Sequence, residues 1–135
     1  MEDLPIVEFA FPGELRDSLV ELVLSGRKTT TTGLLVDYTL QNEPLPVVGG
    51  RFAVVDSNGA VVGTIETVAV EVARLRDVTV EHARDEGEGH TTVAQWRAAH
   101  ERFWHSDAVR CELGDPTFTV DDDTQVVLER FRLVR

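Results

Sequence analysis

The strongest constraint on the fold is the dipeptide Asn58-Gly59, which stands between two apolar segments. Asn-Gly is a strong signal for the tight turn of a β-hairpin. Residues 52–55 before it read Phe-Ala-Val-Val, and residues 61–72 after it are rich in valine. Because β-branched and aromatic residues favour strands, the sequence predicts two antiparallel strands joined by this turn.

Helical segments are predicted on both sides of this hairpin. After Pro12-Gly13, leucine and valine recur at helical spacing through residue 23, and Gly26 stands where a helix C-terminal glycine belongs. Thr79 is suited to cap a short helix over residues 80–85. A further helix is predicted over residues 93–104, because Thr92 and Gln95 have the spacing of a capping box.

Two more strands complete the predicted domain. The threonine run 29–32 continues into Leu34-Leu35-Val36, a β-branched and apolar segment that favours a strand. A final strand is predicted after Pro116, over residues 126–133. Strands and helices mixed in this way predict one α+β domain, residues 1–135, in which helices flank a small curved sheet or barrel.

Lys28 is the only lysine among thirteen basic residues, and it directly precedes the four threonines. An arginine stays charged, whereas a lysine amine can lose its proton when it is desolvated or crowded by charge. The pattern therefore suggests a lysine that activates a threonine hydroxyl. The spacing of Lys28 and Thr31 fits this role if the chain bends at the helix-to-strand junction. An ordinary threonine-rich strand, with one lysine retained by chance, remains the alternative.

The net charge of −11 counts against binding of duplex nucleic acid through an extended basic surface. A small pocket for one nucleotide is still compatible with it, with Arg27, Lys28 and Arg51 as the positive residues. No apolar run approaches the roughly 20 residues that span a membrane. The N-terminal residues are acidic where a signal peptide would be basic, so we expect a cytoplasmic protein without membrane contact. The single cysteine, Cys111, cannot form an internal disulfide and is interpreted as structural.

Glu86 stands out among the acidic residues because Gly87 and Gly89 follow it and would let a backbone approach a ligand closely. Glu86 and Glu88 could also join His90 around a cation, but nothing in the sequence fixes that geometry. The spacings of the four histidines match no standard metal site, and the three aspartates 121–123 are interpreted as a charged turn. No metal or other cofactor is predicted.

An aromatic stripe follows along the helix predicted over residues 93–104. Its members are Trp96, His100, Phe103 and Trp104. Core packing is the commoner role of such a stripe. In the other interpretation Trp96 or His100 borders a pocket, where an aromatic ring can stack on a nucleobase.

In this order, the motifs resemble those of the ASCH domain family, whose fold is a PUA-like β-barrel. The resemblance runs over residues 9–134 and is carried by segments 24–31, 46–49, 63–67, 77–79, 83–89, 96–104 and 127–131. The family is associated with RNA and modified nucleosides. Small members are amidohydrolases that remove the acetyl group from N4-acetylcytidine with a lysine, a threonine and a glutamate. The matching positions here are Lys28, Thr31 and Glu86.

The chain departs from those small amidohydrolases in two places. Its helix over residues 96–104 is one that they lack or shorten, and Gly33 stands where they carry an arginine. The substrate is therefore left open by the resemblance. The substrate-binding residues that we expect are Arg27, Tyr38, Trp96 and His100. The sequence does not indicate an oligomeric state.

The preferred interpretation is a hydrolase that cleaves the amide of an N4-acylated cytidine nucleoside. Thr31 supplies the nucleophile, and Lys28, with a pKa lowered by partial burial and by Arg27, takes the hydroxyl proton. Glu86 holds the lysine or donates a proton to the leaving amine.

Two alternatives remain. In a ribonuclease acting on single-stranded RNA, Lys28 would steady the phosphate while Tyr38 or His100 moves protons. In a non-catalytic RNA- or nucleotide-binding module, Arg27 and Lys28 would contact phosphate and Trp96 would stack on a base.

Overall fold

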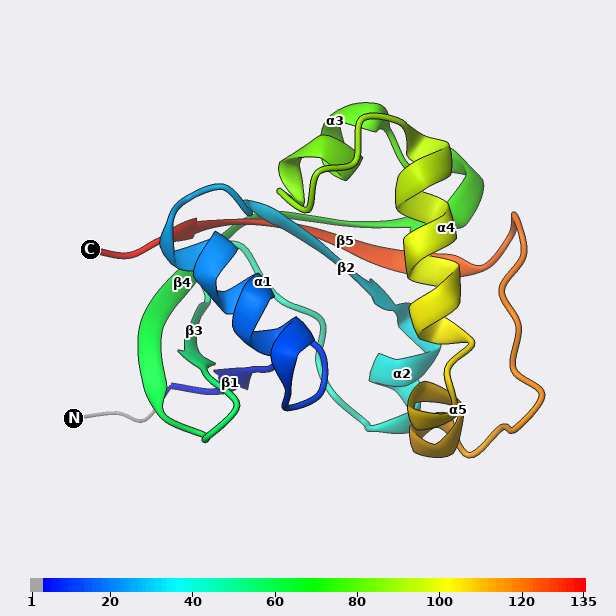
Figure 1. Cartoon of the computed structure of the whole chain (residues 1–135), viewed down its shortest axis with the longest axis horizontal. Coiled ribbons are helices and arrows are strands. Elements are labelled where there is room, and N and C mark those ends of the chain that lie inside the picture. The colour runs from blue at the N-terminus through cyan, green and yellow to red at the C-terminus, as the bar shows by residue number, and fades with distance from the viewer. Residues whose placement is uncertain (1–3) are drawn as a thin grey trace.

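The computed structural model of the protein describes residues 4–135, and its centre is a five-stranded sheet (Figure 1). The strands are β1 (Ile6–Val7), β2 (Thr30–Leu34), β3 (Arg51–Val55), β4 (Val61–Arg74) and β5 (Gln125–Leu133). Their order in the sheet is β1-β3-β4-β5-β2. Only β1 and β3 run parallel, and the other neighbours are antiparallel. The predicted α+β class is therefore confirmed.

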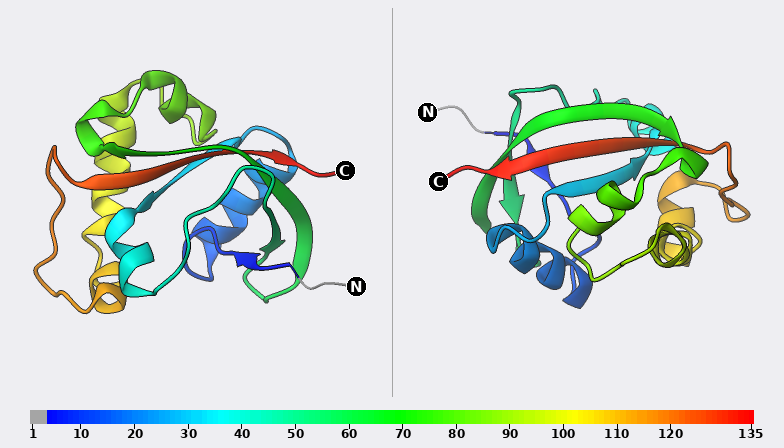
Figure 2. Two further views of the ribbon diagram at one scale, coloured as in Figure 1. Left: turned by 180° about the vertical axis from the view of Figure 1, so that it is seen from behind. Right: turned by 90° about the horizontal axis from the view of Figure 1, so that it is seen from above.

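Helices flank this sheet and occupy the connections between its strands (Figure 2). They are α1 (Glu14–Leu24), α2 (Leu35–Leu40), the 3₁₀ turn η1 (Leu75–Asp77), α3 (Val80–Asp85), α4 (Val93–Trp104) and α5 (Asp107–Leu113). None of the helices in residues 4–135 has the length and apolar character needed to span a bilayer.

The predicted hairpin is present and joins β3 to β4. Gly59 adopts a positive φ of 80°, a conformation that glycine reaches without steric cost. The Asp56 carboxylate accepts hydrogen bonds from the backbone N–H groups of Asn58 and Ala60, at 2.9 and 3.0 Å. The turn is therefore closed by Asp56 as well as by the Asn-Gly pair.

Two predictions about local structure were wrong. Leu35 and Val36 begin α2 and do not continue β2. The ring of Tyr38 in α2 packs beside Gly33, where a Cβ would lie only 3.1 Å from Tyr38 Cε2. The capping box at Thr92 is only half formed. The Thr92 hydroxyl accepts from the Gln95 N–H, as expected. The Gln95 amide oxygen, however, accepts from the backbone N–H and hydroxyl of Thr91 and not from the N–H of Thr92.

Helix α5 was not predicted from the sequence. Its signals are Ser106, whose hydroxyl oxygen accepts a hydrogen bond from the Val109 N–H, and Gly114, which ends the helix with a φ of 68°. Cys111 lies on this helix and is exposed, so it does not contribute to the core.

Two apolar clusters form the core, one toward each end of β5. The first joins α3, α4 and α5 to the ends of β2 and β5, and its buried members are Leu34, Leu75, Val78, Ala83, Trp96, Trp104, Val109, Leu113, Val120, Val126 and Leu128. The second lies between α1 and strands β3–β5, with Phe9, Val20, Val23, Val54, Ile65 and Phe131. Strand β5 contributes to both, so residues near its middle lie between the two clusters.

Candidate functional site

A cavity of about 550 Å³ opens between the two edge strands of the sheet. Residues 6–9 from and after β1 line one side, and Thr31–Leu34 of β2 line the other. Helices α1, α2, α4 and α5 contribute to its walls. Its volume falls within the range of small-molecule sites.

Lys28 lines this cavity, and backbone contacts around it fix its position. The N–H groups of Arg27 and Lys28 both donate to the Leu22 carbonyl, at 3.0 and 3.1 Å, at the end of α1. The Thr29 N–H donates to the Asp85 carbonyl at 2.8 Å. Gly87 has a φ of 76°, and a Cβ there would lie 2.5 Å from the Arg27 carbonyl oxygen. Gly87 therefore allows the backbone of Arg27 to approach closely. From the sequence alone, this glycine was attributed to the approach of a ligand.

These contacts place Lys28 beside Glu86, and both side chains are buried. Lys28 is 2% exposed and Glu86 1%. Lys28 Nζ lies 3.1 Å from Glu86 Oε1. The structure thus brings together two of the three residues predicted to be catalytic.

The Glu86 carboxylate is surrounded by donors. Its Oε2 accepts hydrogen bonds from the Thr32 hydroxyl at 2.7 Å and from the indole N–H of Trp96 at 2.8 Å. His100 Nε2 lies 3.3 Å from Oε1, and His82 Nε2 lies 3.5 Å from Oε2. Burial opposes ionisation, but the charge of Lys28 and the two histidines outweigh it and hold the pKa of Glu86 well below its ordinary value. Glu86 is therefore an ionised carboxylate in this network.

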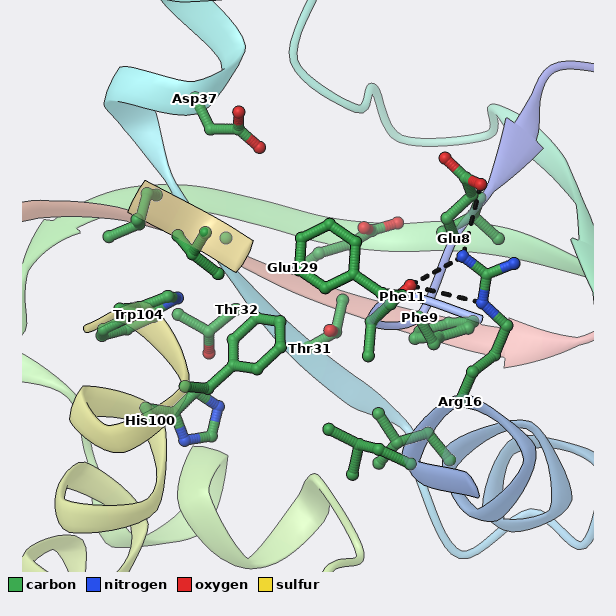
Figure 3. Close-up of a pocket in the computed structure, with 18 of the residues that line it drawn as sticks. Glu8, Phe9, Phe11, Arg16, Thr31, Thr32, Asp37, His100, Trp104 and Glu129 are labelled. Carbon is green, nitrogen blue, oxygen red and sulfur yellow. Dashed lines mark hydrogen bonds and ion pairs between the residues drawn. The ribbon is translucent and has the colours of Figure 1, made fainter. Parts of the chain in front are cut away.

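Thr31, the predicted nucleophile, lies apart from this network but lines the same cavity. Side chains alternate along a strand, so Thr30 and Thr32 face α3 while Thr31 is turned the other way. The Thr30 and Thr32 hydroxyls meet the carbonyl and the ring of His82, at 2.9 and 2.8 Å. Among the hydrogen bonds of residues 4–135, none involves the Thr31 hydroxyl. It is therefore free to meet a bound substrate (Figure 3).

A second carboxylate, Glu88, also approaches Lys28. Its Oε2 lies 3.4 Å from Lys28 Nζ. Burial and the charge of Glu86 raise the pKa of Glu88, against the opposing charge of Lys28. Glu86, Glu88 and His100 have ligand atoms within 4.8 Å of one another, so His100 takes the place that the sequence offered to His90. Lys28 contacts both carboxylates, and a metal ion here would compete with it.

The four predicted substrate-binding residues lie in different places. Tyr38 and His100 line the cavity. Burial, followed by the charge of Glu129, raises the pKa of Tyr38 to about 12, so its phenol remains a hydrogen-bond donor at neutral pH. The Arg27 side chain is exposed and lies outside the cavity lining.

The interpretation of Trp96 as a base-stacking residue was wrong. Trp96 is 0% exposed, and its indole is committed to Glu86. Trp96 and His100 are one helical turn apart, and their rings stack on each other with centroids 4.2 Å apart. The Trp96 ring is therefore packed against protein and is not open to a nucleobase. His100 then lies on the cavity side, with Nδ1 2.9 Å from the Trp96 carbonyl oxygen. Burial opposes charge on His100, but its contacts with Glu86 raise its pKa.

Sequence reasoning missed Glu129, which lines the cavity from β5. It is 5% exposed, and its Oε2 accepts a hydrogen bond of 2.6 Å from the Thr67 hydroxyl. Burial raises the pKa of Glu129, and the bond from Thr67 opposes this shift only in part. The signal was available, since Glu129 is a single acid directly after the apolar run 126–128.

Further acidic side chains surround the cavity. These are Glu8, Asp37, Glu43 and Glu112. Burial and the charges of Asp37, Glu8 and Glu43 raise the pKa of Glu112, which shows that the four influence one another. Beside Lys28, the only other Lys or Arg side chain of the lining is Arg16. Its guanidinium is already bound to the Ala10 carbonyl at 2.7 Å and to Glu8 at 3.3 Å.

Comparison with known proteins identifies the fold and its relatives. A family model described as the ASCH domain matches residues 7–135. The crystal structure of an ASCH domain from Lactobacillus crispatus JV V101 is 27% identical, with a TM-score of 0.81, and the match covers 96% of this chain and 79% of that one. A protein structure from Enterococcus faecalis V583 is 28% identical, with a TM-score of 0.79, over 99% and 77% of the two chains. The comparison with curated proteins found no match.

Proposed function

The chain belongs to the ASCH domain family, and from this premise we propose that it hydrolyses the amide bond of an N4-acylated cytidine nucleoside. The family is PUA-like and generally RNA-related, which is consistent with a nucleoside substrate. The observation that carries the proposal is the buried pair of Lys28 and Glu86, 3.1 Å apart, which lines the same cavity as Thr31.

The proposed chemistry assigns one role to each of these residues. The reactive form is the one in which Lys28 is neutral: the Thr31 hydroxyl attacks the acyl carbon, and Lys28 Nζ takes the hydroxyl proton and becomes charged. Glu86 accepts from Lys28 and holds it in position. Because Lys28, Thr32 and Trp96 all donate to Glu86, the carboxylate is suited to stabilise a positive charge on Lys28. The earlier alternative, in which Glu86 gives a proton to the leaving amine, fits poorly with its lowered pKa.

The charge of the cavity supports a nucleoside over an RNA strand. An RNA-binding groove needs basic side chains along the phosphate backbone. Here Glu8, Asp37, Glu43 and Glu112 line the cavity, and the guanidinium of Arg16 is occupied by protein groups. The negative charges of these carboxylates repel the negative charge of a phosphodiester. An uncharged nucleoside meets no such penalty.

The experiment that tests the proposal compares two substrates. Purified protein is incubated with N4-acetylcytidine and, in parallel, with a mixed single-stranded RNA, and both reactions are followed by chromatography. Thr31→Ala and Lys28→Ala serve as the inactive controls. We expect release of cytidine by the wild-type protein alone, and intact RNA.

Other outcomes would replace the proposal. Cleaved RNA beside intact N4-acetylcytidine would make the protein a ribonuclease, with Tyr38 and His100 as the next residues to change. Binding of either compound without turnover would identify a binding module.

A further inference from the structure

Glu129 and Thr31 face each other across neighbouring strands. They are register partners in the antiparallel pair of β5 and β2. Directly opposed residues in such a pair project to the same face of the sheet, with Cβ atoms about 4.5–5.5 Å apart. Both side chains line the cavity (Figure 3). An acid therefore lies beside the hydroxyl that we propose as the nucleophile.

The surroundings of Glu129 leave part of its carboxyl free. Thr67 of β4 donates to Oε2 at 2.6 Å. Among the hydrogen bonds and ion pairs of residues 4–135, no other involves the Glu129 side chain. Thr31 of β2 lies opposite it in the sheet, Thr67 of β4 donates to it, and its charge acts on the phenol of Tyr38 in α2. Burial raises its pKa, so a proton is held more readily here than on an exposed glutamate.

We propose that Glu129 is the carboxyl that transfers protons in this site, acting first as an acid toward the leaving amine and then as a base toward water. This inference rests on the proposed amide hydrolysis through Thr31. It adds a catalytic residue to the set of Lys28, Thr31 and Glu86.

The proton and bond changes balance over two half-reactions. In the first, the bond from Thr31 Oγ1 to the acyl carbon forms and the carbon–nitrogen bond breaks. Lys28 takes the hydroxyl proton, and Glu129 gives its proton to the leaving nitrogen. In the second, Glu129 takes a proton from water as the oxygen of that water bonds to the acyl carbon. The ester bond to Thr31 breaks, and Lys28 returns its proton to Oγ1.

The test uses Glu129→Gln, which keeps the shape of the side chain and an oxygen that can accept from Thr67. Two substrates separate the two proton transfers. N4-acetylcytidine needs a proton on its leaving nitrogen, whereas the p-nitrophenolate that leaves p-nitrophenyl acetate needs none. Acetylation of Thr31 is followed by intact mass and peptide mapping, and Glu71→Gln on the exposed face of β4 is the matched control.

We expect Glu129→Gln to lose about 10²-fold or more in turnover of N4-acetylcytidine, the usual contribution of a general acid or base. With p-nitrophenyl acetate the variant should still acetylate Thr31, and the acetyl group should accumulate because water is no longer activated. The fall in wild-type activity with rising pH, as Glu129 loses its proton, should be absent from the residual activity of the variant. Glu71→Gln should behave as the wild type.

The outcomes distinguish this inference from the proposed function. A Glu129→Gln variant with wild-type turnover of N4-acetylcytidine overturns the role of Glu129 and leaves the function standing. If the wild type ignores N4-acetylcytidine but acetyl-Thr31 accumulates only in Glu129→Gln, the substrate is wrong and the role of Glu129 stands. If Thr31 is acetylated in neither protein, both proposals fail.

Discussion

Glu86 and Glu129 are both buried glutamates that line one cavity, yet the two carboxyls have opposite surroundings. Glu86 follows α3 and accepts from Lys28, Thr32 and Trp96, with two histidines beyond them. Glu129 lies in the middle of β5 and, within residues 4–135, accepts from Thr67 alone. Burial is the largest single influence on both and raises the pKa of each, but only at Glu86 do neighbouring cations reverse the shift.

The difference shows how one site can hold a fixed charge and a mobile proton side by side. A carboxylate surrounded by donors keeps its charge and orients the groups that contact it. A carboxyl with one hydrogen bond and no cation can change its protonation state within the range where enzymes work. We therefore assign positioning to Glu86 and proton transfer to Glu129.

The same substitution at the two positions should change the free energy of unfolding by very different amounts. Glu86→Gln removes the charge that pairs with buried Lys28, and breaking a buried pair from one side typically costs about 3–5 kcal/mol. Glu129→Gln removes no ion pair and should leave the free energy of unfolding unchanged or slightly higher. Urea unfolding of both variants measures this directly. Equal losses in the two variants would show that the surroundings of the carboxyls do not differ as described.

Lys28→Arg tests whether the partner of Glu86 is more than a positive charge. A guanidinium can still pair with the carboxylate, but it cannot take a proton from Thr31. Turnover of N4-acetylcytidine should fall about 10²-fold or more, while the thermal midpoint stays close to that of the wild type. A Lys28→Arg protein as active as the wild type would rule out the base role. Arg51→Lys, at an exposed ion pair on β3, is the control.

Trp96→Phe removes one donor from Glu86 and keeps most of the aromatic packing. Leaving a buried acceptor with one fewer partner costs about 1–3 kcal/mol. Trp104→Phe is the matched control for stability, since Trp104 is also buried and its indole makes no hydrogen bond within residues 4–135. Chemical unfolding should show a larger loss for Trp96→Phe. A loss confined to Trp104→Phe would mean that the indole N–H contributes nothing to Glu86.

The pH dependence of stability should separate the two carboxyls with a smaller effect. The folded-state pKa of Glu86 is lowered, so its contribution is complete above 4.5, the ordinary value, and is lost as pH falls through the folded value. The folded-state pKa of Glu129 is raised, so ionising it weakens the fold as pH rises above 4.5. Relative to the wild type, Glu129→Gln should therefore gain stability as pH rises. Unfolding curves on both sides of 4.5 check this, and a constant difference would contradict it.

The sequence supports the fold better than it supports the site. The Asn58-Gly59 hairpin, the helix after Thr79 and the last strand follow from local turn, capping and strand preferences, and all are present. Helix α2 was mistaken for strand because Leu35 and Val36 favour strands locally, and packing of Tyr38 beside Gly33 is a tertiary effect.

The pair of Lys28 and Glu86 was proposed together from the family resemblance, and the two side chains do meet. The donors Thr32, His82 and Trp96 could not be assigned from spacing, because they come from three different elements. Glu129 was missed for a related reason. Its position opposite Thr31 depends on the pairing of β2 with β5, which are far apart in the chain.

The most direct test of the account is to titrate the two carboxyls themselves. In protein labelled with ¹³C at the glutamate carboxyl, Glu86→Gln and Glu129→Gln assign the two resonances by their absence, and the wild type is then followed by NMR over pH. We predict a midpoint below 4.5 for Glu86 and above 4.5 for Glu129. Indistinguishable midpoints, or the reverse order, would contradict the division of roles between the two glutamates.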